Sequence, residues 1–553
     1  MHPYLFSTTK MGIQTQALTD SVEVQLQADV LVVGGGPAAT WAAWSAATQG
    51  AKVVLVDKGY CGTSGAAAPS GNTVWYVPPA PDLREEAIAK RIARSGEELC
   101  DRDWMRRVLE QTYDCIHLLE QWGYPFPQDD QGGLYRRSLQ GPEYMRLMRK
   151  QVHRAGVKIL DQSPALELLV AADGVVAGAR GVQRQAGKRW QVNAGAVILA
   201  SGGCAFLSKA LGCNVLTGDG YLMAAEAGAD LSGMEFSNVY GIVPTFATVT
   251  KNAFYRWASF TDEDGTPIEG ANAGKGRPAI AKALLSQPVY AQLHADPMTQ
   301  AMMRTAQPNF FLPFDRDRIN PFTQRFAITL RLEGTVRGTG GIRVVDGGCA
   351  TSVPGLYAAG DAASREIICG GVSGGGSLNV AWAFSSGVWS GAAAAAFARS
   401  LGAATQTRSL YSLGGAATNP QTRAVNPQEL TQAVQAEVFP YERNLFRHAD
   451  VLTDSLNRLN ALWREVRHLG ADAAQTVQSR EAIAMLATAR WMYATALQRQ
   501  ESRGMHKRLD YAQTHTDFHH RLITRGCDRI TVEADATHPK FDSFWYSREV
   551  GAL

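Results

Sequence analysis

Residues 28–39 read ADVLVVGGGPAA, and this stretch decides the fold. Its first half is an apolar, β-branched run that ends in three glycines, which is typical of a buried strand stopping at a tight turn. Pro37 to Thr48 then reads as a helix rich in alanine and tryptophan, and a second apolar run, KVVLV at 52–56, completes a strand–helix–strand unit. The sequence therefore predicts an α/β fold with a Rossmann-like sheet.

The glycine turn matches the fingerprint that binds the pyrophosphate of a dinucleotide, with alanine in its third place. Gly34 permits the tight turn, Gly36 lets the backbone approach a pyrophosphate, and Ala39 permits close packing of helix on strand. Pro37 and Ala38 start the helix, whose free N–H groups and dipole stabilise the phosphates.

Asp57 stands 23 residues after Gly34, at the end of the second strand. This is the place of the acidic residue that accepts a hydrogen bond from a ribose hydroxyl. We assign Lys58, the next residue, to the same cofactor site. The fingerprint alone does not choose between a nicotinamide and a flavin, because both carry adenosine diphosphate.

Composition excludes several classes of protein. A chain of 553 residues predicts two or three domains, and a formal charge of +3 is too small to attract nucleic acid. The eight cysteines are scattered without a Cys-x-x-Cys pair, which argues against a metal or iron–sulfur site on this chain. No signal peptide or membrane-length apolar run is evident, so we expect a cytoplasmic protein without membrane insertion.

Motifs far along the sequence from the glycine turn indicate which cofactor the chain binds. A later apolar strand runs into Ala200-Ser201-Gly202-Gly203, and further motifs are TGDGY at 217–221, PGLYAAGD at 354–361, GGSL at 375–378 and ESRG at 501–504. With these motifs the chain resembles the flavoprotein family of fumarate reductase and succinate dehydrogenase, which includes L-aspartate oxidase and the adenylylsulfate reductase flavoprotein.

The resemblance implies a bound FAD. It assigns the flavin ribityl chain to the acidic residue Asp361 after Gly360, and the isoalloxazine ring to the turn at Ser377 and Leu378. The other cofactor residues that it implies are Ala200, Ser201, Gly202 and Asp219.

The resemblance also implies a division into domains. We expect a Rossmann-like FAD-binding domain with an inserted α+β capping domain and a C-terminal helical domain. The predicted ranges are a flexible leader (1–27), the discontinuous FAD-binding domain (28–236 and 337–400), the capping domain (237–336), a linker (401–426), the helical domain (427–525) and a tail (526–553).

The chain departs from the family at the covalent flavin link. Members that fix their flavin covalently carry a histidine in a Ser-His-Thr segment, and here Ser64 is followed by Gly65. We therefore expect noncovalent FAD, with Ser64 and Gly65 among the residues that contact it.

The chain departs again where the family binds dicarboxylates. Tyr240, Val336 and Val372 stand at the places of two histidines and an arginine, and Lys282 is the nearest match to the proton-delivering arginine. Arg337 adjoins one of the lost positions. The candidate catalytic residues are thus Lys282, Arg337 and Tyr240, and succinate, fumarate and aspartate are poor substrates on this reading.

Other residues of these motifs have two interpretations. Arg365 and Glu366 could face the flavin, and Cys369 is more simply a small buried thiol than a redox group. Glu501 and Arg503 are more simply an internal ion pair than catalysts.

The expected function is oxidation or reduction of a small substrate at FAD, with electrons passed to a separate acceptor such as an iron–sulfur or ferredoxin-like protein. Alternatives are an adenylylsulfate-reductase-like enzyme, a flavin subunit that only relays electrons, and a nicotinamide-only dehydrogenase. Assembly into a homo-oligomer is left open.

Overall fold

The computed structural model describes residues 22–95, 99–128, 132–250, 253–373, 376–402, 408–413, 426–466 and 475–535. The first 21 residues of the predicted leader, most of the predicted linker and the last 18 residues of the predicted tail lie outside these ranges, as does Gly375 of the predicted flavin turn. Everything below concerns the described residues.

The main sheet has eight strands in the order β16-β6-β7-β8-β1-β2-β5, with β15 also paired to β8. Strands β5, β2, β1, β8 and β15 are parallel to one another, and β7, β6 and β16 extend the sheet from β8 in antiparallel fashion. The strand bounds are β1 (Val24–Val33), β2 (Val53–Val56), β5 (Lys158–Leu160), β6 (Ala165–Ala171), β7 (Val176–Val182), β8 (Arg189–Leu199), β15 (Leu356–Ala358) and β16 (Leu410–Ser412). The α/β fold predicted from the sequence is confirmed.

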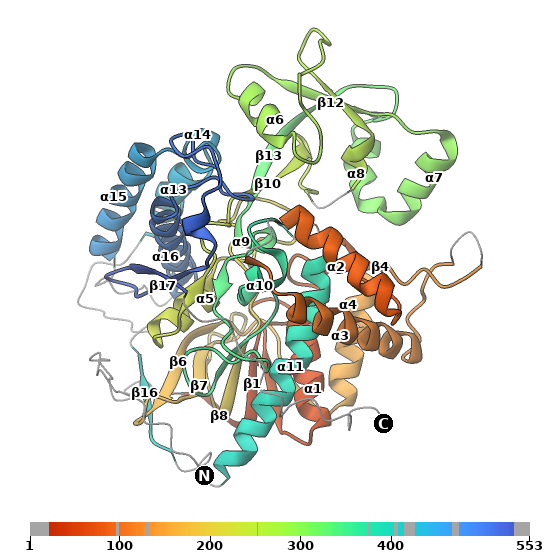
Figure 1. Cartoon of the computed structure of the whole chain (residues 1–553). Coiled ribbons are helices and arrows are strands. Elements are labelled where there is room, and N and C mark those ends of the chain that lie inside the picture. The colour runs from red at the N-terminus through yellow and green to blue at the C-terminus, as the bar shows by residue number, and fades with distance from the viewer. Residues whose placement is uncertain are drawn as a thin grey trace.

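Two helices cover one face of this sheet, as Figure 1 shows at the lower centre. They are α1 (Pro37–Thr48) and α11 (Ser377–Leu401), which pack against each other and against β1 and β8. Small residues make the close approach possible: a Cβ on Gly387 or Gly391 would lie 2.6 Å or 2.4 Å from a carbonyl oxygen of α1. The other helices of this part are α2 (Pro81–Ser95), α3 (Arg102–Gln121), α4 (Gly141–Arg154), α5 (Asp219–Glu226), α9 (Gly334–Arg337) and α10 (Glu366–Cys369).

Helix α11 is the one described helix that is long and apolar enough to cross a membrane. Of its 18-residue apolar window, 67% is buried inside the protein. Because it packs against α1, α3 and β8, its apolar character is that of a core helix.

A second sheet stands apart above the first (Figure 1). Its antiparallel order is β10-β13-β12-β11, and we call residues 239–333 the cap. Phenylalanines of its helices and strands pack edge to face, for example Phe310 with Phe254 and Phe314 with Phe326. The cap elements are β10 (Val239–Pro244), the short 3-10 helix η2 (Phe254–Trp257), β11 (Ala258–Thr261), α6 (Arg277–Leu284), β12 (Val289–Leu293), α7 (Pro297–Ala306), α8 (Pro308–Arg316) and β13 (Phe326–Glu333).

The chain enters and leaves the cap through neighbouring strands. β10 and β13 are antiparallel partners, with Tyr240 opposite Leu332, and Val239 bridges to Gly334 just beyond the cap. The two connections therefore lie side by side at one edge of the core.

A helical bundle packs beside the core, at the left of Figure 1. It comprises α13 (Pro427–Val438), α14 (Tyr441–Asn444), α15 (Ala449–Val466) and α16 (Thr476–Gln498). Charged contacts without access to water join it to the core: Arg499, at the end of α16, pairs with Glu235 at 2.7 Å, and both side chains are fully buried.

The residues after the bundle return to the core. β17 (Leu522–Arg525) pairs with β9 (Leu231–Ser232) and with β18 (Thr531–Ala534), in a small sheet that also holds β14 (Gly341–Ile342). Residues 531–534 of the predicted tail and 410–412 of the predicted linker are thus strands. Residues 410–412 pair with β6, a strand distant in sequence that local sequence pattern does not reveal, whereas residues 531–534 pair with the adjacent β17. The remaining two-stranded sheet joins β3 (Gly71–Thr73) to β4 (Ser138–Gln140).

Candidate flavin and substrate site

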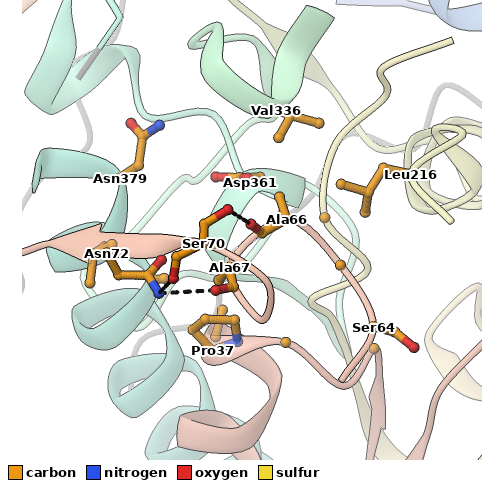
Figure 2. Close-up of a pocket in the computed structure, with 18 of the residues that line it drawn as sticks. Pro37, Ser64, Ala66, Ala67, Ser70, Asn72, Leu216, Val336, Asp361 and Asn379 are labelled. Atoms are coloured by element: carbon orange, nitrogen blue, oxygen red, sulfur yellow. Dashed lines mark hydrogen bonds between the residues drawn. The ribbon is translucent and has the colours of Figure 1, made fainter. Parts of the chain in front are cut away.

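A cavity of about 550 Å³ opens at the carboxyl ends of β1 and β2 and extends toward the cap. Ligands of open α/β sheets bind at this edge, and the volume lies in the range of cofactor and substrate sites. Figure 2 shows Pro37 and Ser64 toward one side of the cavity and Val336 and Leu216 toward the other.

The glycine turn forms one end of the cavity. Gly34 has φ +126°, and a Cβ there would lie 2.2 Å from the carbonyl oxygen of Ala200. A Cβ on Gly36 would meet no protein atom within 4 Å, because that side of the turn faces the cavity. Helix α1 follows with Pro37 in its first turn and no side-chain cap, so its N–H groups are free for a phosphate.

Asp57 lies beside this turn with one oxygen unused. Its carboxyl is buried, Oδ1 accepts a hydrogen bond from the backbone N–H of Gly59 at 3.4 Å, and Oδ2 has no partner. Burial raises the pKa of Asp57 to about 6, although the Gly59 N–H opposes this. A ribose hydroxyl donated to Oδ2 would satisfy the group. Ser201 Oγ and Asn379 Oδ1 of the same cavity lining also lack partners, so the residues present fit FAD.

We predict that Asp57→Ala weakens FAD binding by ~1.5–3 kcal/mol, the range for a hydrogen bond to a charged group. The measurement is a titration of apoprotein with FAD, followed by quenching of flavin fluorescence. Asp57→Asn, which keeps one acceptor oxygen, should lose less. Equal affinity of the alanine variant and the parent protein would contradict the placement of the ribose.

Lys58 is held by two carboxylates. Its Nζ lies 2.7 Å from Asp219 Oδ2 and 3.1 Å from Glu481 Oε1, and it donates to Thr217 Oγ1 at 2.6 Å. Burial alone would lower the pKa of Lys58, but the two carboxylates outweigh it and raise the pKa above its ordinary value. Glu481 belongs to α16, so the helical bundle contributes to the cofactor end of the site. No local signal in the sequence marks Glu481 for this contact.

Most residues assigned to the cofactor line this one cavity. They are Gly34, Gly36, Pro37, Ala38, Asp57, Lys58, Ser64, Gly65, Ala200, Ser201, Gly202, Asp219, Gly360, Asp361 and Ser377. Ala39 and Leu378 are buried behind the lining, where they pack the helix starts against the sheet. Ala39 and Leu378 therefore do not line the cavity, although the sequence predicted that they contact the cofactor.

The residues that line the cavity also indicate whether a flavin would be linked covalently. Gly65 has φ +88° and lines the cavity, and the described lining residues include no histidine, cysteine or tyrosine. These are the side chains whose nucleophilic atoms could form a bond to the flavin ring. The wall at this point therefore fits a cofactor held without a covalent link.

The end of the cavity under the cap is lined by apolar side chains and by two arginines. Val336, Leu216 and Phe254 line it together with Arg337 and Arg256. The Arg337 guanidinium pairs with the fully buried Glu333 at 3.1 Å. Arg256 is partly at the surface, where it donates through Nε to the carbonyl of Ala253 at 3.1 Å and lies over the ring of Trp257.

Two of the three candidate catalytic residues lie elsewhere. The Tyr240 hydroxyl donates to the carbonyl of Val438 at 3.0 Å, because the alternation of β10 turns this side chain toward the helical bundle. Lys282 is exposed on α6 and does not reach the lining. Arg337 alone of the three is brought to the cavity.

The residues with two interpretations form buried contacts within the protein. Arg365 is fully buried, pairs with Asp361 at 2.7 Å and donates to the carbonyls of Thr335 and Val336, so it stands behind the cavity wall. Glu501 accepts from Arg503 at 2.6 Å within the bundle contact.

Cys369 and Glu366 are buried as well. Burial raises the pKa of the Cys369 thiol to about 12, so the reactive thiolate is disfavoured. Glu366 accepts from Ser232 at 2.5 Å, in the small sheet behind α10.

Arg277 is a further cation that the sequence did not single out. It starts α6, and its Nε is buried without a hydrogen-bond partner. Burial and the neighbouring Arg337 lower the pKa of Arg277 to about 10, against the attraction of Glu333. The surrounding glycines and the short helix gave no period from which its direction could be inferred. Among the described residues, no cluster of side chains could hold a metal ion.

Two parts of this chain match known protein families. Residues 29–246 match the family described as FAD binding domain, and residues 428–541 match the fumarate reductase flavoprotein C-terminal family. L-Aspartate oxidase of Streptomyces coelicolor is 26% identical over 93% of this chain and 94% of its own. A fumarate reductase flavoprotein subunit of Mycobacterium tuberculosis is 25% identical over 91% and 95%.

Solved structures share the fold. The E. coli quinol fumarate reductase superposes with a TM-score of 0.76 at 20% identity, over 94% of this chain and 98% of that one. Adenylylsulfate reductase of Archaeoglobus fulgidus gives 0.70 at 19% identity, over 92% and 96%. The two family matches show that the chain is an FAD-binding flavoprotein oxidoreductase with a C-terminal domain of the fumarate reductase flavoprotein type, and the solved structures share its fold.

Proposed function

We propose that the chain oxidises or reduces a small substrate other than a simple dicarboxylate, at noncovalent FAD, and passes electrons to a separate acceptor. The observation that carries the proposal is the apolar wall under the cap, where Val336 and Leu216 face the cavity and Tyr240 turns away. A dicarboxylate needs matched charges at both ends, and this wall offers none at one of them.

Different parts of the chain would bind the cofactor, exclude water and orient the substrate. FAD when bound would supply the exchange of an electron pair with the substrate, as a hydride. In the proposed division, residues 28–236 and 337–400 hold the cofactor, and the cap closes the site to water. Arg337 and Arg256 are the ionisable groups at the substrate end of the lining, so they are the candidates to orient the substrate and move its proton.

A separate electron acceptor is part of the proposal. Relatives named fumarate reductase flavoprotein subunit are, by that name, parts of larger assemblies. With no metal-binding cluster among the described residues of this chain, we propose that electrons pass to an iron–sulfur or ferredoxin-like protein. The cytoplasmic location expected from the sequence stays a prediction.

The first test concerns the cofactor. We predict that FAD leaves the protein when the chain is precipitated with acid, because Gly65 stands at the linking position and the described lining has no histidine, cysteine or tyrosine. The supernatant and the washed precipitate are assayed for flavin absorbance. Flavin that stays with the washed chain would contradict noncovalent binding.

The second test concerns the chemistry. The FAD-loaded protein is screened anaerobically with small molecules for bleaching of the flavin, and the reduced protein is screened for reoxidation. A single compound that changes the redox state without a partner protein supports an enzyme. A flavin that responds only to another protein would favour a subunit that relays electrons.

A further inference from the structure

Helix α9 joins the cap to the wall of the cavity. It spans Gly334–Arg337, directly after β13 of the cap, and its residues Val336 and Arg337 line the cavity. The last carbonyl groups of a helix have no partner within it and need donors from elsewhere. In α9 these donors come from Arg365, which lies outside the helix.

Arg365 caps the C-terminal end of α9. Its Nη2 donates to the carbonyl oxygens of Thr335 at 3.1 Å and Val336 at 3.0 Å, and also to that of Gly338. A cation at this end of a helix satisfies the last carbonyls and interacts favourably with the helix dipole. Because the Arg365 side chain is fully buried, water does not compete for these contacts.

The other side of the same guanidinium contacts a residue of the predicted cofactor site. Arg365 Nη1 pairs with Asp361 Oδ1 at 2.7 Å, and Asp361 lines the cavity. Among the described residues, Asp361 is the one carboxylate that pairs with Arg365. The planar guanidinium presents its donors in a rigid fork, so the carboxylate and the end of α9 are held at a fixed separation.

A second buried contact joins the same two elements. The hydroxyl oxygen of Tyr221 lies 2.7 Å from the carbonyl oxygen of Asp361 and 2.9 Å from Thr335 Oγ1. Thr335 Oγ1 also accepts a hydrogen bond from the backbone N–H of Cys204 at 2.7 Å, just beyond the Ala-Ser-Gly-Gly motif at 200–203. The side chains of Tyr221 and Thr335 are fully buried. Both ends of α9 are therefore tied to the wall that the cofactor would contact.

We propose that Arg365 is a positioning residue, which holds α9 to Asp361 so that bound FAD fixes the substrate end of the cavity. Val336 and Arg337 are the residues placed in this way. An ionised carboxylate accepts several hydrogen bonds at once, so a ribityl hydroxyl of FAD and Arg365 can share Asp361. This role requires the bound cofactor but no particular substrate.

The proposed role has a consequence for local opening of the backbone. A ligand shifts a protein toward the state that it binds better, and amide hydrogen exchange reports local opening. FAD should therefore slow exchange in α9. The reporters are the backbone N–H groups of Thr335 and Gly338, which donate to the carbonyls of Cys204 at 3.0 Å and Gly334 at 2.9 Å.

The experiment is hydrogen exchange of the apoprotein and of the FAD-saturated protein, followed by mass spectrometry of peptides that contain residues 334–338. In the parent protein, FAD should slow exchange there by about tenfold, a typical coupling between two sites. Arg365→Met removes the charge and the donors, and it should lose most of this effect while FAD is still bound. An arginine that only supports the fold would speed exchange in both states and leave the effect of FAD unchanged.

A second variant and a matched control keep the result clear of folding defects. Arg365→Lys keeps a cation for Asp361 but lacks the fork that also reaches the carbonyls, so it too should lose most of the effect. Arg447→Met is the control. Arg447 is just as buried, but it donates to the carbonyls of Asn444 at 3.0 Å and Glu235 at 2.7 Å, away from the cavity lining. This control should keep the full effect of FAD on α9.

Three outcomes would overturn the proposed role of Arg365. They are equal exchange of residues 334–338 in the apo and FAD-saturated parent protein, an unchanged effect of FAD in the Arg365 variants, and a loss in Arg447→Met as large as in those variants. If Arg365→Met does not fold, Arg365→Lys decides.

Discussion

Succinate and fumarate should not be turned over at useful rates by the FAD-loaded protein, whatever artificial electron carrier is supplied. One carboxylate of either compound can be matched by Arg337 and its neighbours, but the other would face Val336 and Leu216. An unmatched carboxylate in a site closed from water costs several kcal/mol. Since each ~1.4 kcal/mol is a factor of ten in rate, turnover should fall by several orders of magnitude.

The assay uses succinate with a dye acceptor and fumarate with a reduced viologen. Reduction of the same flavin by dithionite, followed by reoxidation in air, is the control that the cofactor is competent. Robust turnover of either dicarboxylate would show that Tyr240, Val336 or Val372 was assigned to the wrong place, and the proposed substrate class would fail with it.

Gly34→Ala should abolish stable FAD binding. The left-handed backbone at φ +126° costs an alanine ~1–2 kcal/mol. In addition, the new methyl would lie 2.2 Å from the carbonyl oxygen of Ala200, and such overpacking costs a further ~1–3 kcal/mol. Because β1 and β8 meet at this point, the strain falls on the floor of the cofactor site.

Gly36→Ala is the matched comparison. Its methyl would meet no protein atom within 4 Å but would occupy the side of the turn that faces the cavity. We expect its apoprotein to unfold at the temperature of the parent apoprotein while its FAD content falls. Gly34→Ala should lose both stability and FAD. The flavin-to-protein absorbance ratio and thermal unfolding separate the two, and full FAD content in Gly34→Ala would refute the structural reason.

The cofactor half of the site could be predicted because its signals are local. Gly34, Gly36 and Asp57 lie within one strand–helix–strand unit, where the spacing of a few residues fixes the geometry. The distant motifs at Asp219 and Asp361 added their residues by resemblance. The cavity brings all of these together.

The substrate half could not be predicted to the same depth. Helix α6 has eight residues, too few for periodicity to show whether Arg277 or Lys282 faces the core. Tyr240 lies on a short strand buried on both faces, so its direction follows from its neighbours and not from alternation in the sequence. Glu481 reaches Lys58 across a separation of more than 400 residues, which local reasoning does not cover.

The charged contacts of this chain differ in how closely dissolved ions can approach them. Salt should therefore weaken some of these contacts and leave others unchanged. The contact of Arg499 with Glu235 is fully buried, so counter-ions cannot approach it and the bundle should stay attached to the core at any ionic strength. The pair of Arg106 with Glu85, in contrast, lies 2.6 Å apart at the surface, where the screening length shrinks to about 3 Å at 1 M salt. Concentrated salt would therefore weaken such surface pairs while the helical bundle stays attached to the core.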